Sequence, residues 1–278
     1  MRTSAGNEKN GLPWLRIAAM VLAAAVFCYA GWQLFLYWNE NNASGQTTQE
    51  LIDQAVEVVS FPKETPKPSV ESSAPVSSEL PYPEISYTIP LRVNFEALQA
   101  QNPDIVAWIY CEGTPIHYPV VQGEDNQYYL HRLTDGSYNA NGTIFMDFRN
   151  ERDFSDRNTL IYGHNMTNDA MFGCLSNYKE QAFYDEHPQM WILTADVAYR
   201  VDLVAGFVTA SDSDDYSFFG SEDELQAHLE EAVGKSTFVS NVDLAGVERI
   251  VTLSTCTYEY NTARYVVVGS LVPAEYPR

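Results

Sequence analysis

A thiol and a guanidinium stand at the two ends of one loop near the C-terminus. In the stretch VTLSTCTYEYNTARYVVVGSLV (251–272), Cys256 closes one strand-like run and Arg264 opens the next. Alternate residues of a strand share a face, so Ser254 and Cys256 point the same way. If the two runs pair as a hairpin, Cys256 and Arg264 face each other at its mouth. Taken alone, such a pair is more typical of a buried cysteine beside a surface arginine.

A histidine occupies a comparable position in NTLIYGHNM (158–166), where His164 follows an apolar run and Gly163. A thiolate attacks a carbonyl far better than a thiol does, and a neighbouring cation raises the thiolate fraction. His164 would protonate a leaving amine, and Arg264 would hold the oxyanion of a tetrahedral intermediate. Each of the other four histidines is more typical of a structural or solvated side chain: His117, His131, His187 and His228.

Short apolar runs rich in Val, Ile, Thr and Tyr must position these groups, and they predict eight strands. Eight short strands with few helices favour a closed barrel or a sandwich. Helical patterns cover 93–102, ended by Pro103, and 221–236, where Ser221 and Glu224 form a capping box. The predicted strands are 104–111, 117–122, 142–148, 158–164, 190–196, 198–210, 248–256 and 264–272.

The N-terminal region contains an apolar run long enough to cross a bilayer. From Ile17 to Trp38 only Gln33 is strongly polar, and about 20 residues of helix span the hydrocarbon core. Basic residues precede the run and Glu40 follows it, which predicts a cytoplasmic N-terminus and an extracellular remainder. A cleaved signal peptide ending near Ala30 is the alternative. The run exceeds the usual apolar core of a signal peptide, which favours an uncleaved anchor.

The segment after the anchor changes composition. Residues 47–60 fit a short amphipathic helix, and residues 61–90 are rich in Pro, Ser and Glu. Such a composition predicts an extended tether that holds the folded part away from the membrane. The predicted organisation is a cytoplasmic N-terminus at 1–13, a transmembrane anchor at 14–38, an extracellular tether at 39–90 and a catalytic domain at 91–278.

Charge and cysteine content restrict the function further. A formal net charge of -21 argues against a nucleic-acid partner. Outside the anchor, which contains Cys28, the chain has an odd number of cysteines. Cys111 and Cys174 could form a bridge or remain two buried free thiols.

The acidic run 211–224 could be a calcium site or a solvated loop, and its spacing does not match that of an EF-hand. We expect no metal and no cofactor.

Taken together, the motifs resemble the sortase cysteine transpeptidases. TLSTC, an arginine eight residues after the cysteine and an upstream Tyr-Gly-His carry the resemblance. GTIFMDFRN, TLIYGHNM, MFGCLSNY and the helix before the last two strands are similar to class B members. The resemblance implies a mainly β fold: a closed eight-stranded barrel with an N-terminal helix and one helix inserted before the last two strands. A single transmembrane helix precedes the barrel.

The resemblance also implies a mechanism and partners. Cys256 would attack the carbonyl of a threonine in the C-terminal sorting signal of a surface protein, and an amine would resolve the thioacyl enzyme. That amine would come from peptidoglycan of a Gram-positive wall, from its lipid-linked precursor, or from a pilin lysine. Thr257 stands where some class B members have an acidic residue, which puts a helper carboxylate there in doubt. The substrate-binding residues nominated by similarity or position are Asn126, Leu130, Tyr216 and Ser254.

Two other functions fit the same residues. A cysteine endopeptidase would use the same nucleophile with water as the acceptor, because acceptor choice depends on groove shape. A membrane-anchored scaffold barrel without catalytic activity belongs to a different class, and only the reactivity of Cys256 separates it from an enzyme.

Overall fold

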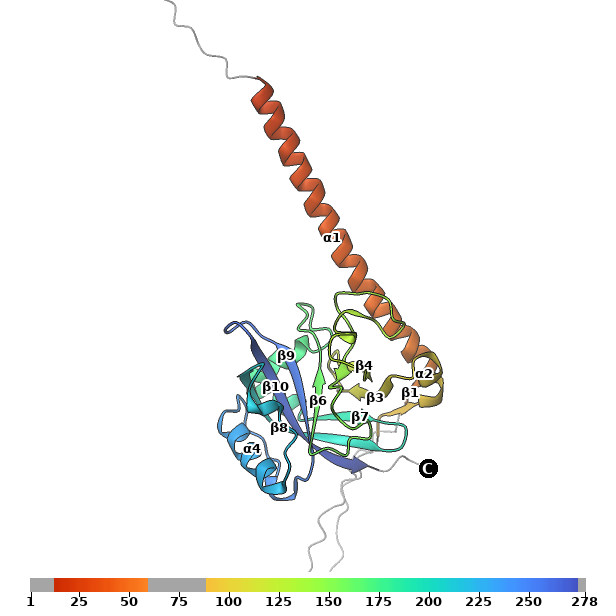
Figure 1. Ribbon diagram of the computed structural model, residues 1–278, viewed down its shortest axis with the longest axis vertical. Coiled ribbons are helices and arrows are strands. Elements are labelled where there is room, and N and C mark those ends of the chain that lie inside the picture. Colours follow the sequence, from red (N-terminus) through yellow and green to blue (C-terminus); the bar gives the residue numbers. More distant parts are fainter. Residues whose placement is uncertain (1–12, 60–88, 275–278) are drawn as a thin grey trace, which may run out of the picture.

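The computed structural model describes residues 13–59 and 89–274 (Figure 1). A long helix, α1 (Pro13–Ala55), leads into a domain built mainly from strands. The strands are β1 (Val56–Val58), β2 (Leu91–Val93), β3 (Ile105–Tyr110), β4 (His117–Val121), β5 (Phe145–Met146), β6 (Asn158–Tyr162), β7 (Gln189–Leu193), β8 (Ala198–Ala210), β9 (Ile250–Cys256) and β10 (Ala263–Ala274). The other helices are α2 (Phe95–Gln101), α3 (Gln181–Glu186), α4 (Glu222–Gly234) and the 3-10 turns η1 (Tyr129–His131), η2 (Gly173–Lys179), η3 (Asp214–Tyr216) and η4 (Leu244–Gly246).

Eight strands close into a barrel in the order β10-β8-β7-β3-β4-β5-β6-β9. The predicted closed eight-stranded barrel is therefore confirmed, as are a helix before the first barrel strand and α4 before the last two strands. Most pairs are antiparallel, but β4 runs parallel to β5 and β6 runs parallel to β9. Because their carboxyl ends meet at one end of the barrel, the segments that follow Tyr162 and Cys256 lie side by side.

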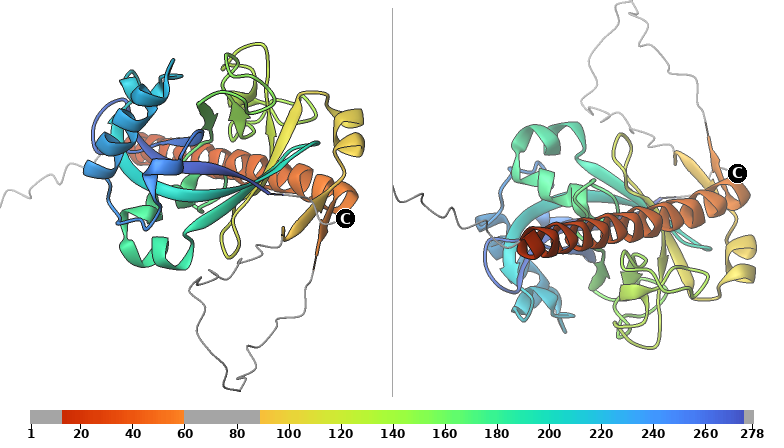
Figure 2. Two further views of the ribbon diagram at one scale, coloured as in Figure 1. Left: turned by 90° about the horizontal axis from the view of Figure 1, so that it is seen from below. Right: turned by 90° about the horizontal axis from the view of Figure 1, so that it is seen from above.

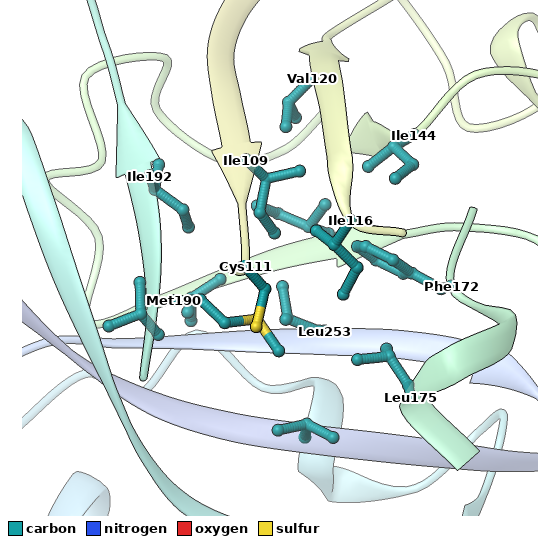
Figure 3. Close-up of a cluster of buried hydrophobic side chains, with 14 of the residues drawn as sticks. Ile109, Cys111, Ile116, Val120, Ile144, Phe172, Leu175, Met190, Ile192 and Leu253 are labelled. Atoms are coloured by element: carbon teal, nitrogen blue, oxygen red, sulfur yellow. The ribbon is translucent and has the colours of Figure 1, made fainter. Parts of the chain in front are cut away.

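The alternation within the strands separates side chains that fill the barrel interior from those on its outer face. In β9, Val251 and Leu253 belong to the interior cluster, so Ser254 and Cys256 lie on the outer face. The interior is filled by aliphatic and aromatic side chains from strands on all sides of the barrel (Figure 3). Those labelled in the close-up include Ile109, Ile116, Val120, Ile144, Phe172, Met190 and Ile192.

The helix α4 covers the outer face of β8 and β10. Leu225 and Leu229 pack there against apolar strand residues. Its N-terminus has the predicted capping residue, because the Ser221 hydroxyl accepts a hydrogen bond from the Glu224 amide at 3.2 Å. The Glu224 carboxylate reaches back to the amide of Gly220 at 2.7 Å, one residue earlier than in a regular capping box.

The structure differs from the predicted tether over its first part. Residues 39–55 continue α1 as helix, which confirms the helix predicted at 47–60 as far as Ala55, and β1 then pairs with β2. The reason is that Leu51 and Ala55, at helical spacing, are buried against α2 and the neighbouring strands, at 3% and 7% exposure. The Pro-rich remainder, 60–88, and the predicted cytoplasmic residues 1–12 lie outside the described residues.

The two cysteines of the barrel interior are free thiols, so the structure contains no bridge between them. Cys111 and Cys174 are each 1% exposed. Burial raises the pKa of both thiols, which keeps them protonated and poorly nucleophilic.

Candidate active site

Cys256 and Arg264 occupy directly opposed positions on neighbouring strands. They are register partners in the antiparallel pair of β9 and β10. Side chains of opposed residues in such pairs start from Cβ atoms about 4.5–5.5 Å apart. Both side chains are partly exposed at the end of the hairpin. The hairpin predicted from the sequence is confirmed, because Arg264 stands directly across the ladder from Cys256. The Arg264 guanidinium donates to the carbonyl oxygens of Ala263 at 3.0 Å and Thr262 at 3.3 Å.

His164 reaches the same level through the parallel pair of β6 and β9. Tyr162 is the register partner of Ser254, and the amide of Gly163 donates to the Ser254 carbonyl at 3.1 Å. His164 follows Tyr162 by two residues and Cys256 follows Ser254 by two residues, so the two are at the same level. The side-chain amide of Asn165 donates to the Cys256 carbonyl at 2.7 Å, which ties the two segments together.

The imidazole of His164 is oriented by the turn η1. Its Nε2 lies 2.8 Å from the carbonyl oxygen of Leu130. Because a carbonyl can only accept, Nε2 carries the hydrogen, and Nδ1 is the nitrogen that takes up a second proton. The ring of His131 stacks on the ring of His164 with centroids 5.8 Å apart.

The environment of His164 favours its neutral form. Burial lowers the pKa of His164 most strongly, the Leu130 carbonyl opposes this, and the charge of His131 lowers it further. A neutral imidazole at this position can accept a proton from a thiol and return it to a leaving amine.

A cavity of about 380 Å³ contains all seven residues that the sequence nominates. This volume is within the range of about 300–1,000 Å³ that is typical of ligand pockets. Its lining includes the three predicted catalytic residues and the four predicted substrate-binding residues: His164, Cys256, Arg264, Asn126, Leu130, Tyr216 and Ser254. The structure therefore brings the nominated residues together, and their roles remain a prediction.

Tyr216 and Ser254 form one wall of this cavity. Their hydroxyl oxygens lie 2.9 Å apart, which links the turn η3 to the outer face of β9. The Tyr216 ring also stacks on Tyr162, with centroids 6.2 Å apart. Burial raises the pKa of Tyr216 to about 12, although the hydrogen bond from Ser254 opposes the rise, so this phenol stays neutral at neutral pH.

A second part of the cavity lining depends on Asp147, which sequence reasoning missed. Its side chain is fully buried and accepts hydrogen bonds from Arg149 at 2.8 and 2.9 Å, from Asn126 at 2.9 Å and from Tyr162 at 3.0 Å. Burial alone would raise the pKa of Asp147, but these bonds outweigh it and lower the pKa. One carboxylate thus fixes three side chains that line the cavity. The signal in the sequence is the polar pair inside GTIFMDFRN, whose partners only the fold reveals.

Two acidic groups near the site are already paired. Glu259 binds the Lys179 ammonium at 2.5 Å and accepts a hydrogen bond from the hydroxyl of Thr257, so its carboxylate is paired. Thr257 is buried and places a hydroxyl, not a carboxylate, next to Cys256. In the run 211–224, the buried Asp215 accepts from Lys235 at 2.7 Å. Among the residues that the structure describes, no group of three or more His, Cys, Asp or Glu side chains is arranged to hold a metal ion.

A comparison with known protein families identifies the family to which this domain belongs. The family model described as the Sortase domain matches residues 109–272, which is more than half of the chain and includes β4 to β9 and the whole cavity. The chain belongs to the sortase family. Members of this family are cysteine transpeptidases, which agrees with a thiol, an imidazole and a guanidinium around one cavity.

Two relatives place this sortase in class B. It is 32% identical to sortase B of Listeria monocytogenes over 262 residues, covering 91% of this chain and 94% of the relative. It is 36% identical to sortase B of Staphylococcus aureus over 186 residues, covering 66% of this chain and 76% of the relative. Both similarities extend over most of the relative's length, so the predicted class is confirmed.

Solved structures agree with this assignment. A Staphylococcus aureus sortase B–substrate complex superimposes on this sortase with a TM-score of 0.61 and 35% identity, covering 65% of this chain and 85% of that chain. A sortase B from Bacillus anthracis gives a TM-score of 0.65 and 30% identity, covering 87% of this chain and all of that chain. The barrel and its helices are therefore those of a class B sortase.

Proposed function

We propose that this sortase joins surface proteins to the cell wall by cysteine transpeptidation. Cys256 attacks the carbonyl of the threonine in a C-terminal sorting signal, and the C-terminal fragment leaves. An amine of peptidoglycan, of its lipid-linked precursor or of a pilin lysine then resolves the thioester. The observation that carries the proposal is the convergence of Cys256, His164 and Arg264 on one cavity.

Each of the three groups has a distinct task. The Cys256 thiol loses its proton to His164 and forms the bond to the carbonyl carbon. The Arg264 guanidinium donates hydrogen bonds to the oxyanion that develops there. His164 returns the proton to the nitrogen of the leaving peptide, and later takes one from the incoming amine.

The remaining cavity residues would bind the sorting signal. Asn126 and Tyr162 have fixed orientations through Asp147, and Tyr216 is fixed through Ser254. Preformed walls of this kind lower the entropy cost of binding an extended peptide. Leu130 contributes an apolar contact from the turn that also holds His164.

The helix α1 would anchor the enzyme in the membrane. It is long and apolar enough to cross a bilayer, and its residues from Trp14 to Trp38 are exposed in the isolated chain. We place the N-terminus in the cytoplasm and the barrel outside, because Arg2, Lys9 and Arg16 precede or begin the span.

The test is peptide cleavage with and without an added amine. Candidate sorting peptides, each with a fluorophore and a quencher on either side of the scissile bond, are incubated with the enzyme and an oligoglycine or diaminopimelate-type acceptor. Transpeptidation predicts a ligated product that grows with amine concentration. An enzyme that releases only the free acid at every amine concentration would be a hydrolase, and one that cleaves none of the peptides would contradict the proposal.

A further inference from the structure

The part of α1 that follows its apolar stretch is bound to the barrel. The side-chain amide of Asn139 donates to the Glu40 carbonyl at 2.8 Å, and that of Asn141 donates to the side-chain oxygen of Asn41 at 2.7 Å. Further along, the helix buries its apolar face down to Ala55. The helix is therefore attached to the domain along this whole length, and it has no flexible joint there.

The contact begins within the apolar stretch itself. The hydroxyl oxygens of Tyr37 and Thr167 lie 3.3 Å apart. Thr167 is three residues from His164, in the loop 163–172 that follows β6. The loop that carries the catalytic histidine is therefore level with the last residues of the predicted membrane span.

The length of the helix leaves no room between the domain and a bilayer. At about 1.5 Å per residue, the helix from Trp14 to Tyr37 rises about 35 Å. The hydrocarbon core takes about 30 Å of this, and the headgroup layers extend several ångströms beyond it on each side. Once the apolar stretch is embedded, the loop at Thr167 lies at the depth of the headgroups.

We propose that α1 is a rigid strut that holds the His164 and Cys256 end of the cavity close to the phospholipid surface. The loops at this end of the barrel, called here the rim, are 132–142, 163–172 and 257–262. Figure 1 shows that they gather at the end from which α1 leaves the domain, and that α1 leans toward the hairpin of β9 and β10. Seen from above, the N-terminal half of α1 projects across this end (Figure 2, right).

The exposed side chains of the rim suit a headgroup layer. Tyr138, Tyr258 and Tyr260 are 68%, 82% and 48% exposed. Tyrosine is enriched at membrane interfaces because its ring enters the apolar boundary while its hydroxyl stays hydrated. Tyr138 directly precedes Asn139, whose side chain binds α1 at Glu40, two residues beyond the predicted end of the span.

This position defines a class of substrate, a consequence that rests on the proposed function. The parallel strands β6 and β9 end at the rim, so the end of the cavity that holds His164 and Cys256 lies there. A peptide that is itself held in the same membrane close to its scissile bond reaches Cys256 without any bending of the enzyme. The strut therefore favours membrane-held substrates over freely diffusing ones.

Photo-crosslinking to lipid tests the position without using activity. The full chain is reconstituted in nanodiscs of phosphatidylglycerol and phosphatidylcholine, with p-benzoylphenylalanine replacing Tyr138 or Tyr258. Phe27, which is 79% exposed in the span, is the positive control, and Val58, 64% exposed beyond the far end of α1, is the negative control. We expect lipid adducts at Tyr138, Tyr258 and Phe27 and none at Val58. Adducts at Phe27 alone would overturn the proposal.

Lengthening the strut tests its consequence. Seven helix-forming residues inserted between Trp38 and Asn39 increase the distance between the barrel and the bilayer by about 10 Å. They rotate the membrane-spanning part of α1 relative to the barrel by only about 20°. The matched control carries the same insertion between Ser77 and Ser78. We expect the first insertion to slow turnover of a lipid-anchored sorting peptide more than tenfold and to leave turnover of the soluble peptide unchanged. Equal turnover of the anchored peptide by both variants would contradict the strut, whereas a parent enzyme inactive on both peptides would contradict the proposed function alone.

Discussion

The carbonyl oxygen of Leu130 accepts a hydrogen bond from Nε2 of His164 at 2.8 Å, across 34 positions of sequence. A residue nominated for binding the substrate thus also orients the proposed acid. The backbone of η1 must keep its place for this contact to exist, and Gly142 is what allows that. Gly142 has φ of 58°, and a Cβ there would lie 2.5 Å from the carbonyl oxygens of both Tyr129 and Leu130.

Gly142→Ala should therefore impair catalysis through His164. The added methyl group pushes the Leu130 carbonyl away and moves the imidazole. A displacement of about 1 Å costs up to about 100-fold in rate, so we expect kcat/KM to fall by about 10- to 100-fold. Gly234→Ala is the control, because Gly234 ends α4 with no atom near a new Cβ. Peptide cleavage by the two variants decides the matter, and equal activities would refute the link between η1 and His164.

Arg264→Lys should lower kcat while leaving substrate binding nearly intact. Lysine keeps the charge but loses the planar fork of donors. Loss of one oxyanion donor costs about 100- to 1000-fold in kcat. Arg92→Lys, on β2 and outside the cavity, should behave like the parent. Steady-state kinetics with a sorting peptide measure both effects, and a raised KM with unchanged kcat would assign Arg264 to binding instead.

Asp147→Asn should weaken both the fold and substrate binding. An amide cannot accept from Arg149, Asn126 and Tyr162 as the carboxylate does. Hydrogen bonds to charged groups contribute about 1.5–3 kcal/mol, and Arg149 is half exposed, so we expect a loss near the lower figure together with a severalfold rise in KM.

A control for this change exists in the same barrel. Asp202 accepts two hydrogen bonds from the Arg200 guanidinium, both at 2.7 Å. As with Asp147 and Arg149, the two residues are two positions apart in the sequence, but this pair lies outside the cavity. Asp202→Asn should lose stability without any change in KM. Urea denaturation and kinetics on both variants make the comparison, and an unchanged KM in Asp147→Asn would mean that the carboxylate serves the fold alone.

The protonation of His164 should make the protein less stable in mild acid. Burial lowers the pKa of His164 below its ordinary value of about 6.5. Above that value the imidazole is neutral in both the folded and the unfolded chain. As pH falls below it, the unfolded chain binds the proton first, so the free energy of unfolding decreases until pH has passed the folded-state pKa.

Two measurements check this sign. An NMR titration of the histidine ring should give a midpoint below that of an unfolded control peptide. Urea denaturation between about pH 7.5 and 5.5 should show a smaller loss of stability in His164→Gln than in the parent. A ring that titrates above the peptide would show that the contact with Leu130 outweighs burial.

The sequence predicted the parts of the site that local pattern controls. Cys256 and Arg264 share one hairpin, so alternation and a turn suffice to place them opposite each other. His164 could be placed only at a strand end, because its neighbour in space is fixed by the parallel pairing of β6 with β9. The motif resemblance implied that His164 and Cys256 act at one site, but it did not state which strands pair.

The parts that were missed depend on contacts between distant segments. Asp147 binds Asn126, 21 positions before it, and Tyr162, 15 positions after it. The hydrophobic periodicity of a sequence carries no information about hydrogen bonds between such distant residues. The continuation of α1 was missed for a related reason. A helix was predicted at 47–60, but composition alone could not show that it continues the apolar helix and packs against the domain.

Mass spectrometry of a trapped acyl enzyme tests the central claim most directly. The enzyme is quenched in acid during turnover of a sorting peptide and digested, and the peptide containing Cys256 is analysed beside that of Cys256→Ala. We predict that Cys256 carries the N-terminal part of the substrate up to its threonine, and that the alanine variant neither cleaves nor forms an adduct. Undiminished cleavage by the variant, or an acyl group on another residue, would show that Cys256 is not the nucleophile.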